Sequence, residues 1–195
     1  MNYIPNIISG LRILLIPIFA YFLLHLKFDI ALFIFLIMGL SDAFDGFLAR
    51  YLKCETLIGS YLDASADKIM INISLYLLFD INIIPLYIVI IVITRDIIML
   101  IGIIYNMYGN KKVSIDPIFS SKINTFIQIV LIIYCLLYLN NIIKLNYLQD
   151  LINVVIFTTI FSAIEYTYRY KINNFIRKIK IQKYESINSA ISKKH

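Results

Sequence analysis

The sequence is poor in charge, cysteine, histidine and tryptophan, and these shortages narrow what the protein can be. Only 15% of its 195 residues are charged, whereas a soluble domain normally carries about a quarter. Its two cysteines, Cys54 and Cys135, form neither a paired framework nor a CxxC metal motif, and we interpret both as structural. The histidines, His25 and His195, lie at the edge of an apolar segment and at the end of the chain, where we expect surface roles. Tryptophan is absent, and the 28 Tyr and Phe residues are expected in a core and an interfacial belt.

Apolar residues dominate what remains. They make up 61% of the chain, and the mean hydropathy is +0.82. A helix needs about 20 mostly apolar residues to cross the hydrocarbon core, so a chain of this length has room for about six crossings. We therefore predict an all-α integral membrane protein with six transmembrane helices, without a cleaved signal peptide, at residues 6–26, 29–50, 57–79, 83–107, 121–143 and 148–168.

The basic residues predict the orientation of these spans. The short links after the first, third and fifth spans hold only Lys27 and Lys144, whereas the other side holds Lys53, Lys111, Lys112 and a basic tail. By the positive-inside rule, both termini and the loops at 51–56 and 108–120 are cytoplasmic. We predict a membrane domain over 1–170 and a basic cytoplasmic tail over 171–195. With a net charge of +6, the chain is expected to contact anionic headgroups rather than nucleic acid.

Four aspartates interrupt this apolar sequence: Asp42, Asp45, Asp63 and Asp67. An acid within a membrane segment is costly and usually faces a bundle interior or a wet cavity. Residues three and four apart share one face of a helix, so the acids form two stripes on consecutive, antiparallel helices. Carboxylate oxygens suit Mg²⁺ or Mn²⁺ rather than zinc, and four of them are compatible with two ions. The pattern predicts a metal site.

Small residues and an arginine accompany the acids. Gly46, Ala49 and Gly59 leave room for a phosphate-bearing group, and Arg50 can bind a phosphate through two parallel hydrogen bonds. One alternative is that the acids are structural groups paired with Lys68, Arg50 or Arg95. Another is a divalent-cation transporter, but that would distribute acids along a pore and contain inverted repeats, and no repeat is visible.

The spacing D-x2-D-G-x2-A-R-x8-G-x3-D-x3-D resembles the signature of the CDP-alcohol phosphatidyltransferases. The residues that match it are Asp42, Asp45, Gly46, Ala49, Arg50, Gly59, Asp63 and Asp67. The resemblance implies a six-helix, homodimeric membrane enzyme that uses Mg²⁺ or Mn²⁺ to displace CMP from a CDP-linked donor by an alcohol. It implies that Asp42, Asp45, Asp63 and Asp67 bind the metals, with Asp67 also acting as the base. The CDP pocket is then lined by Asp42, Gly46, Ala49, Arg50 and Gly59.

Other segments resemble two branches of this family, the CMP-forming cardiolipin synthases and the phosphatidylglycerophosphate synthases. The opening Ile4-Pro5-Asn6 suits both branches. The segments that begin at Ala66, Thr94 and Ser121 resemble the cardiolipin branch more, whereas Ala64-Ser65 stands where both branches usually have Pro-Leu. The resemblance implies CDP-diacylglycerol as donor, in a bacterial or mitochondrial-type inner membrane. We favour phosphatidylglycerol as acceptor, giving cardiolipin and CMP, with glycerol-3-phosphate as the alternative acceptor.

Arg95, Lys122 and Arg12 are the candidates for binding the acceptor's phosphate. An arginine within an apolar span needs an anionic partner. The alternative for Arg95 is a structural pair with Asp96 or Glu165. The alternative for Lys122, at a helix start, is that its ammonium simply extends to the lipid headgroups.

Overall fold

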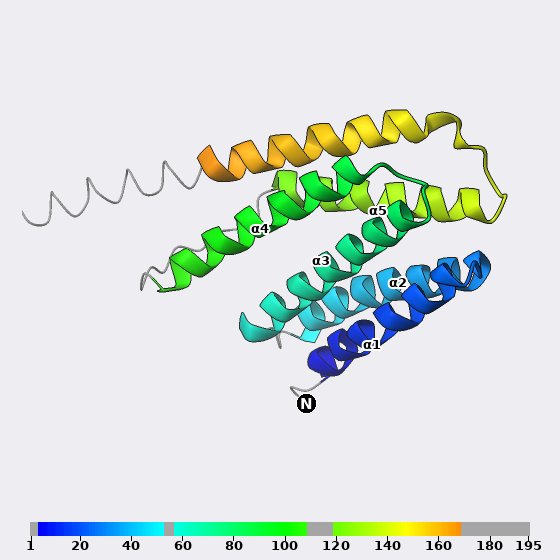
Figure 1. Ribbon diagram of the computed structural model, residues 1–195. Coiled ribbons are helices and arrows are strands. Elements are labelled where there is room, and N and C mark those ends of the chain that lie inside the picture. Colours follow the sequence, from blue (N-terminus) through cyan, green and yellow to red (C-terminus); the bar gives the residue numbers. More distant parts are fainter. Residues whose placement is uncertain (1–3, 53–56, 109–118, 169–195) are drawn as a thin grey trace, which may run out of the picture.

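The computed structural model describes residues 4–52, 57–108 and 119–168, and it describes side chains at 14–41, 66–101 and 119–168. Within these ranges the chain is helical and contains no strand. Five helices carry labels in Figure 1, and a further helix spans residues 148–168. The labelled helices are α1 (Ile4–Leu24), α2 (Phe28–Leu52), α3 (Leu57–Asp80), α4 (Leu86–Tyr108) and α5 (Phe119–Leu139), and the short 3₁₀ helix η1 (Leu145–Tyr147) precedes the last helix. The all-helical prediction is confirmed.

Three helices end in the same kind of turn, with one residue in the left-handed region. The positive φ angles are 57° at Leu26, 60° at Asn82 and 58° at Asn141. In each turn this residue donates its N–H to the carbonyl three residues back, and the next residue donates to the carbonyl five residues back. This is the Schellman arrangement, which pairs carbonyls that a helix end leaves free. Asn tolerates the left-handed conformation better than most residues, which suits Asn82 and Asn141.

These turns correct two predicted boundaries. The fifth span was expected to reach residue 143, but α5 ends at Leu139 because the backbone turns at Asn141. The fourth span was expected to begin at 83, but α4 begins at Leu86, directly after Pro85. Proline lacks an N–H and is well tolerated at a helix start, where that group would have no helical partner.

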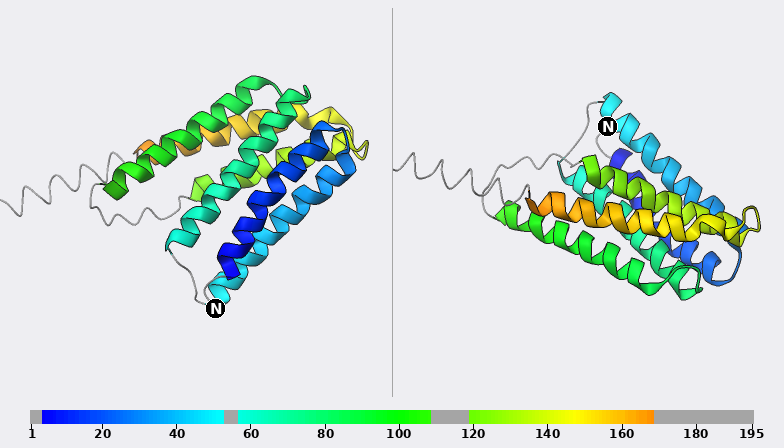
Figure 2. Two further views of the ribbon diagram at one scale, coloured as in Figure 1. Left: turned by 60° about the horizontal axis from the view of Figure 1, so that its bottom comes forward. Right: turned by 90° about the horizontal axis from the view of Figure 1, so that it is seen from above.

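The helices form a bundle in which successive helices run in opposite directions (Figure 1). The three turns at 25–27, 81–85 and 140–147 lie at one end of the bundle (Figure 2). Helix α3 is central because it packs against α1, α4 and α5, while α1 and α5 also pack against α2. One apolar core runs through these contacts, and its fully buried members include Leu23, Leu75, Leu78, Ile88, Leu131 and Leu136.

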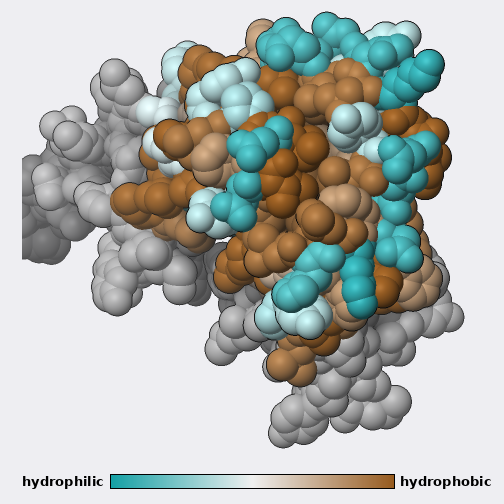
Figure 3. Space-filling model, turned by 45° about the vertical axis from the view of Figure 1, so that its right-hand side comes forward, coloured by the Kyte–Doolittle hydropathy of each residue, from teal (hydrophilic) through white to brown (hydrophobic). Residues whose placement is uncertain are grey.

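The outer surface of the bundle is also rich in large apolar side chains. Exposed examples on different helices are Leu14, Phe33, Ile90, Phe126 and Phe157. Figure 3, which brings the turn end forward, shows apolar residues around and between the polar ones. Contiguous apolar surface of this kind marks contact with a membrane or another protein. Among the described residues, two helical segments are long and apolar enough to cross a membrane: Phe119–Leu139 and Leu145–Tyr168.

The central position of α3 gives a stability prediction. Leu75 is fully buried on α3, whereas Leu36 on α2 is 40% exposed. Replacement of Leu75 by Ala leaves a cavity among packed side chains and should lower the free energy of unfolding by about 2–4 kcal/mol. Leu36→Ala is the matched control and should cost well under half as much. Equal losses in a detergent unfolding titration would contradict the packing described for α3.

Candidate functional site

The predicted acid stripes lie on two helices whose backbones the structure describes. Helix α2 continues to Leu52 and α3 begins at Leu57, so positions 42, 45, 63 and 67 are all helical. This confirms the premise that residues three and four apart share a helix face. The end of α2 and the start of α3 lie at the same end of the bundle, opposite the three turns (Figures 1 and 2). The two helices run antiparallel, as predicted, and α1 packs against both.

Asp67 is the one acid of the motif whose side chain is described. It is partly buried and follows Ala66, which is 1% exposed. The other predicted site side chains, which lie outside the described ones, are Arg12, Asp42, Asp45, Gly46, Ala49, Arg50, Gly59 and Asp63. In the part of the chain with described side chains, no group of three or more His, Cys, Asp or Glu residues could hold a metal. The metal centre therefore stays a prediction.

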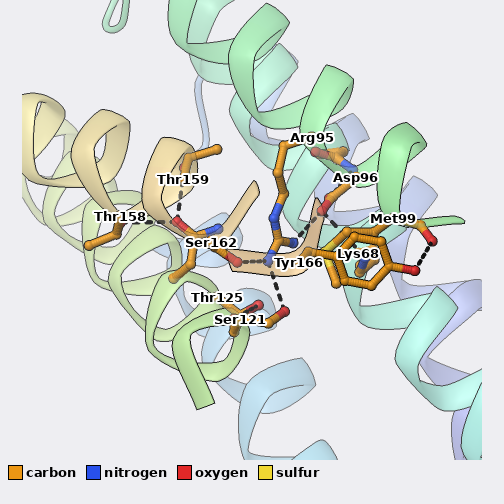
Figure 4. A network of polar contacts seen from close by, with 12 residues as sticks. Lys68, Arg95, Asp96, Met99, Ser121, Thr125, Thr158, Thr159, Ser162 and Tyr166 are labelled. Carbon is orange, nitrogen blue, oxygen red and sulfur yellow. Dashed lines mark hydrogen bonds and ion pairs between the residues drawn. The ribbon is translucent and has the colours of Figure 1, made fainter. Parts of the chain in front are cut away.

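A buried charged cluster includes Lys68, the residue that follows Asp67, and is drawn in Figure 4. Asp96 on α4 accepts a 2.7 Å hydrogen bond from Arg95 and lies 3.4 Å from the ammonium of Lys68 on α3. Its second oxygen accepts a 3.1 Å hydrogen bond from the Asn72 amide. The Asp96 and Arg95 side chains are 7% and 3% exposed. The structural Arg95–Asp96 pair, which the sequence left as an alternative, is present.

Arg95 extends this cluster to two more helices. One terminal nitrogen donates at 2.8 Å to Ser121 on α5 and at 2.6 Å to Ser162 on the last helix. Its Nε has no partner among the described residues. Four helices are thus joined at one level by a single chain of charged and hydroxyl groups. A buried charge is tolerated only when it is paired and hydrogen-bonded in this way.

A second polar contact joins α5 to the last helix (Figure 4). The side-chain carbonyl of Asn124 accepts hydrogen bonds from Thr158 at 3.0 Å and Thr159 at 2.8 Å. Further along, the Tyr166 hydroxyl donates to the backbone carbonyl of Met99 on α4 at 3.3 Å. Hydroxyl and amide contacts between helices hold membrane bundles together where lipid supplies no hydrophobic drive.

The candidate acceptor residues are not alike. Arg95 is buried with both terminal nitrogens engaged, whereas Lys122 is exposed at the start of α5, directly after Ser121. The sequence reasoning missed Asn72 and Ser162 as partners in this cluster. The signal was available, because Lys68 and Asn72 are four apart on one face of α3, and Thr159, Ser162 and Tyr166 form a polar stripe with helical spacing.

The sequence of the chain is similar to a protein family and to several known proteins. The family model for CDP-alcohol phosphatidyltransferase matches residues 2–164. The chain is 33% identical to a rat CMP-forming cardiolipin synthase and 34% identical to the human one, each over 84% of this chain and 60% of the relative. It is 32% identical to a CDP-diacylglycerol–glycerol-3-phosphate 3-phosphatidyltransferase of Aquifex aeolicus, over 78% of this chain and 84% of that protein. The chain thus spans about three fifths of the length of the rat and human relatives.

The buried cluster predicts a large stability effect at Arg95. In Arg95→Met the Asp96 carboxylate loses its shortest charged contact but keeps Lys68 and Asn72. We therefore expect a loss of about 3 kcal/mol, the lower end of the range for breaking a buried pair. Lys122→Met, at an exposed lysine, should change the free energy of unfolding by about 0.5 kcal/mol or less. Equal stability of the two variants in a detergent unfolding titration would refute a buried Arg95–Asp96 pair.

Proposed function

This chain belongs to the CDP-alcohol phosphatidyltransferase family, and we propose from this premise that it synthesises phospholipid in a membrane. In the proposed reaction, an alcohol attacks the phosphatidyl phosphorus of CDP-diacylglycerol and CMP leaves. The observation that carries the proposal is the complete acid motif on α2 and α3, within a family match that covers residues 2–164.

The donor set of the motif fits a divalent ion. Asp42, Asp45, Asp63 and Asp67 supply only carboxylate oxygens, which Mg²⁺ and Mn²⁺ prefer. Their positions lie on helical α2 and α3, at the same end of the bundle. We propose that these four residues hold two ions. Bound there, the ions would offset the negative charge of the donor's pyrophosphate.

The remaining residues of the motif are assigned to the donor and to proton transfer. Gly46, Ala49 and Gly59 lack bulk and leave space for the cytidine diphosphate, and Arg50 pairs with one of its phosphates. Asp42 is proposed to contact the donor as well as the metal. Asp67 is proposed to take the proton from the attacking hydroxyl, because a carboxylate within the cluster is already close to the reacting atoms.

Phosphatidylglycerol is the acceptor that we propose, with cardiolipin as the product. In support, the cardiolipin synthases of rat and human match 84% of this chain. Glycerol-3-phosphate remains the second candidate, because the Aquifex aeolicus relative is nearly as similar and is matched over 84% of its length. Both acceptors present a glycerol hydroxyl and a phosphate. Lys122 is the accessible cation for that phosphate. Arg12 and the Nε of Arg95, which has no partner among the described residues, are the further candidates.

We also propose that the chain crosses the membrane six times, with both termini on the cytoplasmic side. The two segments apolar enough to cross a membrane and the apolar outer surface support a membrane location. The distribution of Lys and Arg supports the orientation. The basic tail over 171–195 is assigned to anionic headgroups of an inner membrane. A homodimer is proposed from the family likeness alone. The relatives described above are named cardiolipin synthases and a phosphatidyltransferase, which leaves the transporter alternative without support.

The metal centre predicts which acids are required. Release of CMP from CDP-diacylglycerol should require Mg²⁺ or Mn²⁺, and Asp42→Ala, Asp45→Ala or Asp63→Ala should each reduce it at least about 100-fold by removing a metal ligand. Asp29→Ala is the matched control, because Asp29 is an exposed acid at the start of the same helix as Asp42 and Asp45. Near-normal CMP release by any of the three site variants would remove that residue from the proposed ligand set.

The acceptor prediction is tested with the purified protein and CDP-diacylglycerol. Phosphatidylglycerol should support CMP release and cardiolipin formation, and glycerol-3-phosphate should be a poor substrate. The two differ in size, because phosphatidylglycerol brings two acyl chains and must enter from the bilayer. If glycerol-3-phosphate supported CMP release and phosphatidylglycerol did not, the acceptor assignment would change while the proposed metal chemistry stood.

A further inference from the structure

Asp96 makes contacts that go beyond neutralising its neighbour Arg95. One of its oxygens is shared by Arg95 and Lys68, and the other accepts a hydrogen bond from Asn72. Two of these three partners lie on α3. The carboxylate therefore connects α4 to α3 through both of its oxygens, inside a part of the bundle where it is almost fully buried.

The two partners on α3 fix one face of that helix. Lys68 and Asn72 are four residues apart, so they lie one above the other on the same side. Asp67 precedes Lys68 directly and therefore lies about 100° around the helix from it. The Lys68–Asn72 face is held against α4. At 100° per residue, the stripe of positions 63 and 67 is centred about 140° around α3 from that face, on the side turned away from it.

We propose that Asp96 is a positioning residue for the metal-binding stripe of α3. By binding Lys68 and Asn72 together, it sets the rotation of α3 about its own axis and so sets where the Asp63 and Asp67 carboxylates stand relative to α2. This inference rests on the proposed function, because it assigns Asp96 a role in the same metal centre without giving it any contact with metal or substrate.

A small rotation is enough to matter. A carboxylate carried roughly 5–6 Å from the helix axis moves about 1 Å for each 10° of rotation. A misplacement of about 1 Å at a reacting group can cost about 100-fold in rate. A hydrogen bond and an ion pair at two heights along α3 resist such a rotation better than a single contact does, because each contact holds a different turn of the helix.

The need to neutralise the charge of Arg95 does not by itself explain why Asp96 also contacts Lys68 and Asn72 on α3. Arg95 already bonds to Asp96 at 2.7 Å and to two serines, and that pairing needs nothing from α3. The Asn72 bond adds no charge compensation, because an amide is neutral. It holds α3 in register against α4 at the turn after Lys68.

The test compares metal dependence with stability in the purified full-length protein. Two quantities are measured in wild type, Asp96→Asn, Asn72→Ala and the control Thr159→Val. The first is the dissociation constant for Mn²⁺, from electron paramagnetic resonance without substrate. The second is CMP release as a function of Mg²⁺ concentration, with each rate divided by the folded fraction from thermal unfolding. Thr159→Val is a matched control because it removes a buried hydrogen bond between α5 and the last helix and leaves α3 untouched. Asn72→Ala is the less disruptive variant, because it removes one hydrogen bond to Asp96 and leaves every charged group of the cluster in place.

If Asp96 positions the stripe, Asp96→Asn should raise the Mn²⁺ dissociation constant and the Mg²⁺ concentration for half-maximal activity about 10-fold, and lower the rate per folded molecule about 30-fold. Asn72→Ala should change each of these quantities in the same direction by about 3-fold, and its result tests the proposal if Asp96→Asn does not fold. Thr159→Val should lose stability while its Mg²⁺ dependence stays at the wild-type value. A wild-type Mg²⁺ dependence in Asn72→Ala and in folded Asp96→Asn would overturn the positioning role and leave the proposed function intact. Absence of metal-dependent CMP release from wild type itself would overturn the proposed function and the positioning role together.

Discussion

An ionised side chain that leaves water must find its counter-charge and its hydrogen bonds inside the protein, and this requirement organises the described part of the bundle. Arg95 and Asp96 are buried on α4. Their partners come from α3, α5 and the last helix. Isolated charges here would cost several kcal/mol each, so the four helices are expected to keep their relative positions as long as the cluster is complete.

Backbone hydrogen bonds hold the turn end of the bundle, whereas side-chain charges and hydroxyls join the helices at the level of Arg95. At the turn end, backbone groups satisfy one another through the three Schellman turns, and Asn140 adds side-chain hydrogen bonds to the carbonyls of Phe28 and Leu136. The charged cluster instead contacts α3 at Lys68 and Asn72, in the turns directly after Asp67. The acid motif lies in the halves of α2 and α3 away from the turns, so helices rather than loops carry the proposed ligands. Sites built on helices hold their geometry more closely than sites built on loops.

Much of the fold was predictable because apolar runs of helical length leave few alternatives. The helix at 148–168 and the start of α3 at Leu57 agree with the predicted segments. The end of α5 was misplaced because the apolar pattern continues through Ile142 and Ile143, whereas the left-handed backbone at Asn141 is a local property that hydropathy does not report. The family resemblance, which depended on the spacing of the aspartates, is confirmed over residues 2–164.

The polar cluster was predictable only in part. Arg95 and Asp96 are adjacent in the sequence, so their pairing could be proposed without a structure. Ser162 is 67 residues from Arg95. Its stripe with Thr159 and Tyr166 indicates a polar face on the last helix, but the spacing does not indicate that this face meets α4 at the level of Arg95. The roles of the motif residues rest on spacing and family likeness, because the side chains of Asp42, Asp45 and Asp63 lie outside those that the structure describes.

The central claim is that four aspartates on α2 and α3 hold divalent ions. Anomalous X-ray diffraction from crystals grown with Mn²⁺ tests it most directly. We expect anomalous peaks within about 2.0–2.3 Å of carboxylate oxygens of Asp42, Asp45, Asp63 and Asp67, at distances typical of oxygen ligands to such ions, and we expect Asp45→Ala to weaken or remove them. Saturating Mn²⁺ that bound elsewhere, or that left these carboxylates without a peak in an active enzyme, would contradict the account.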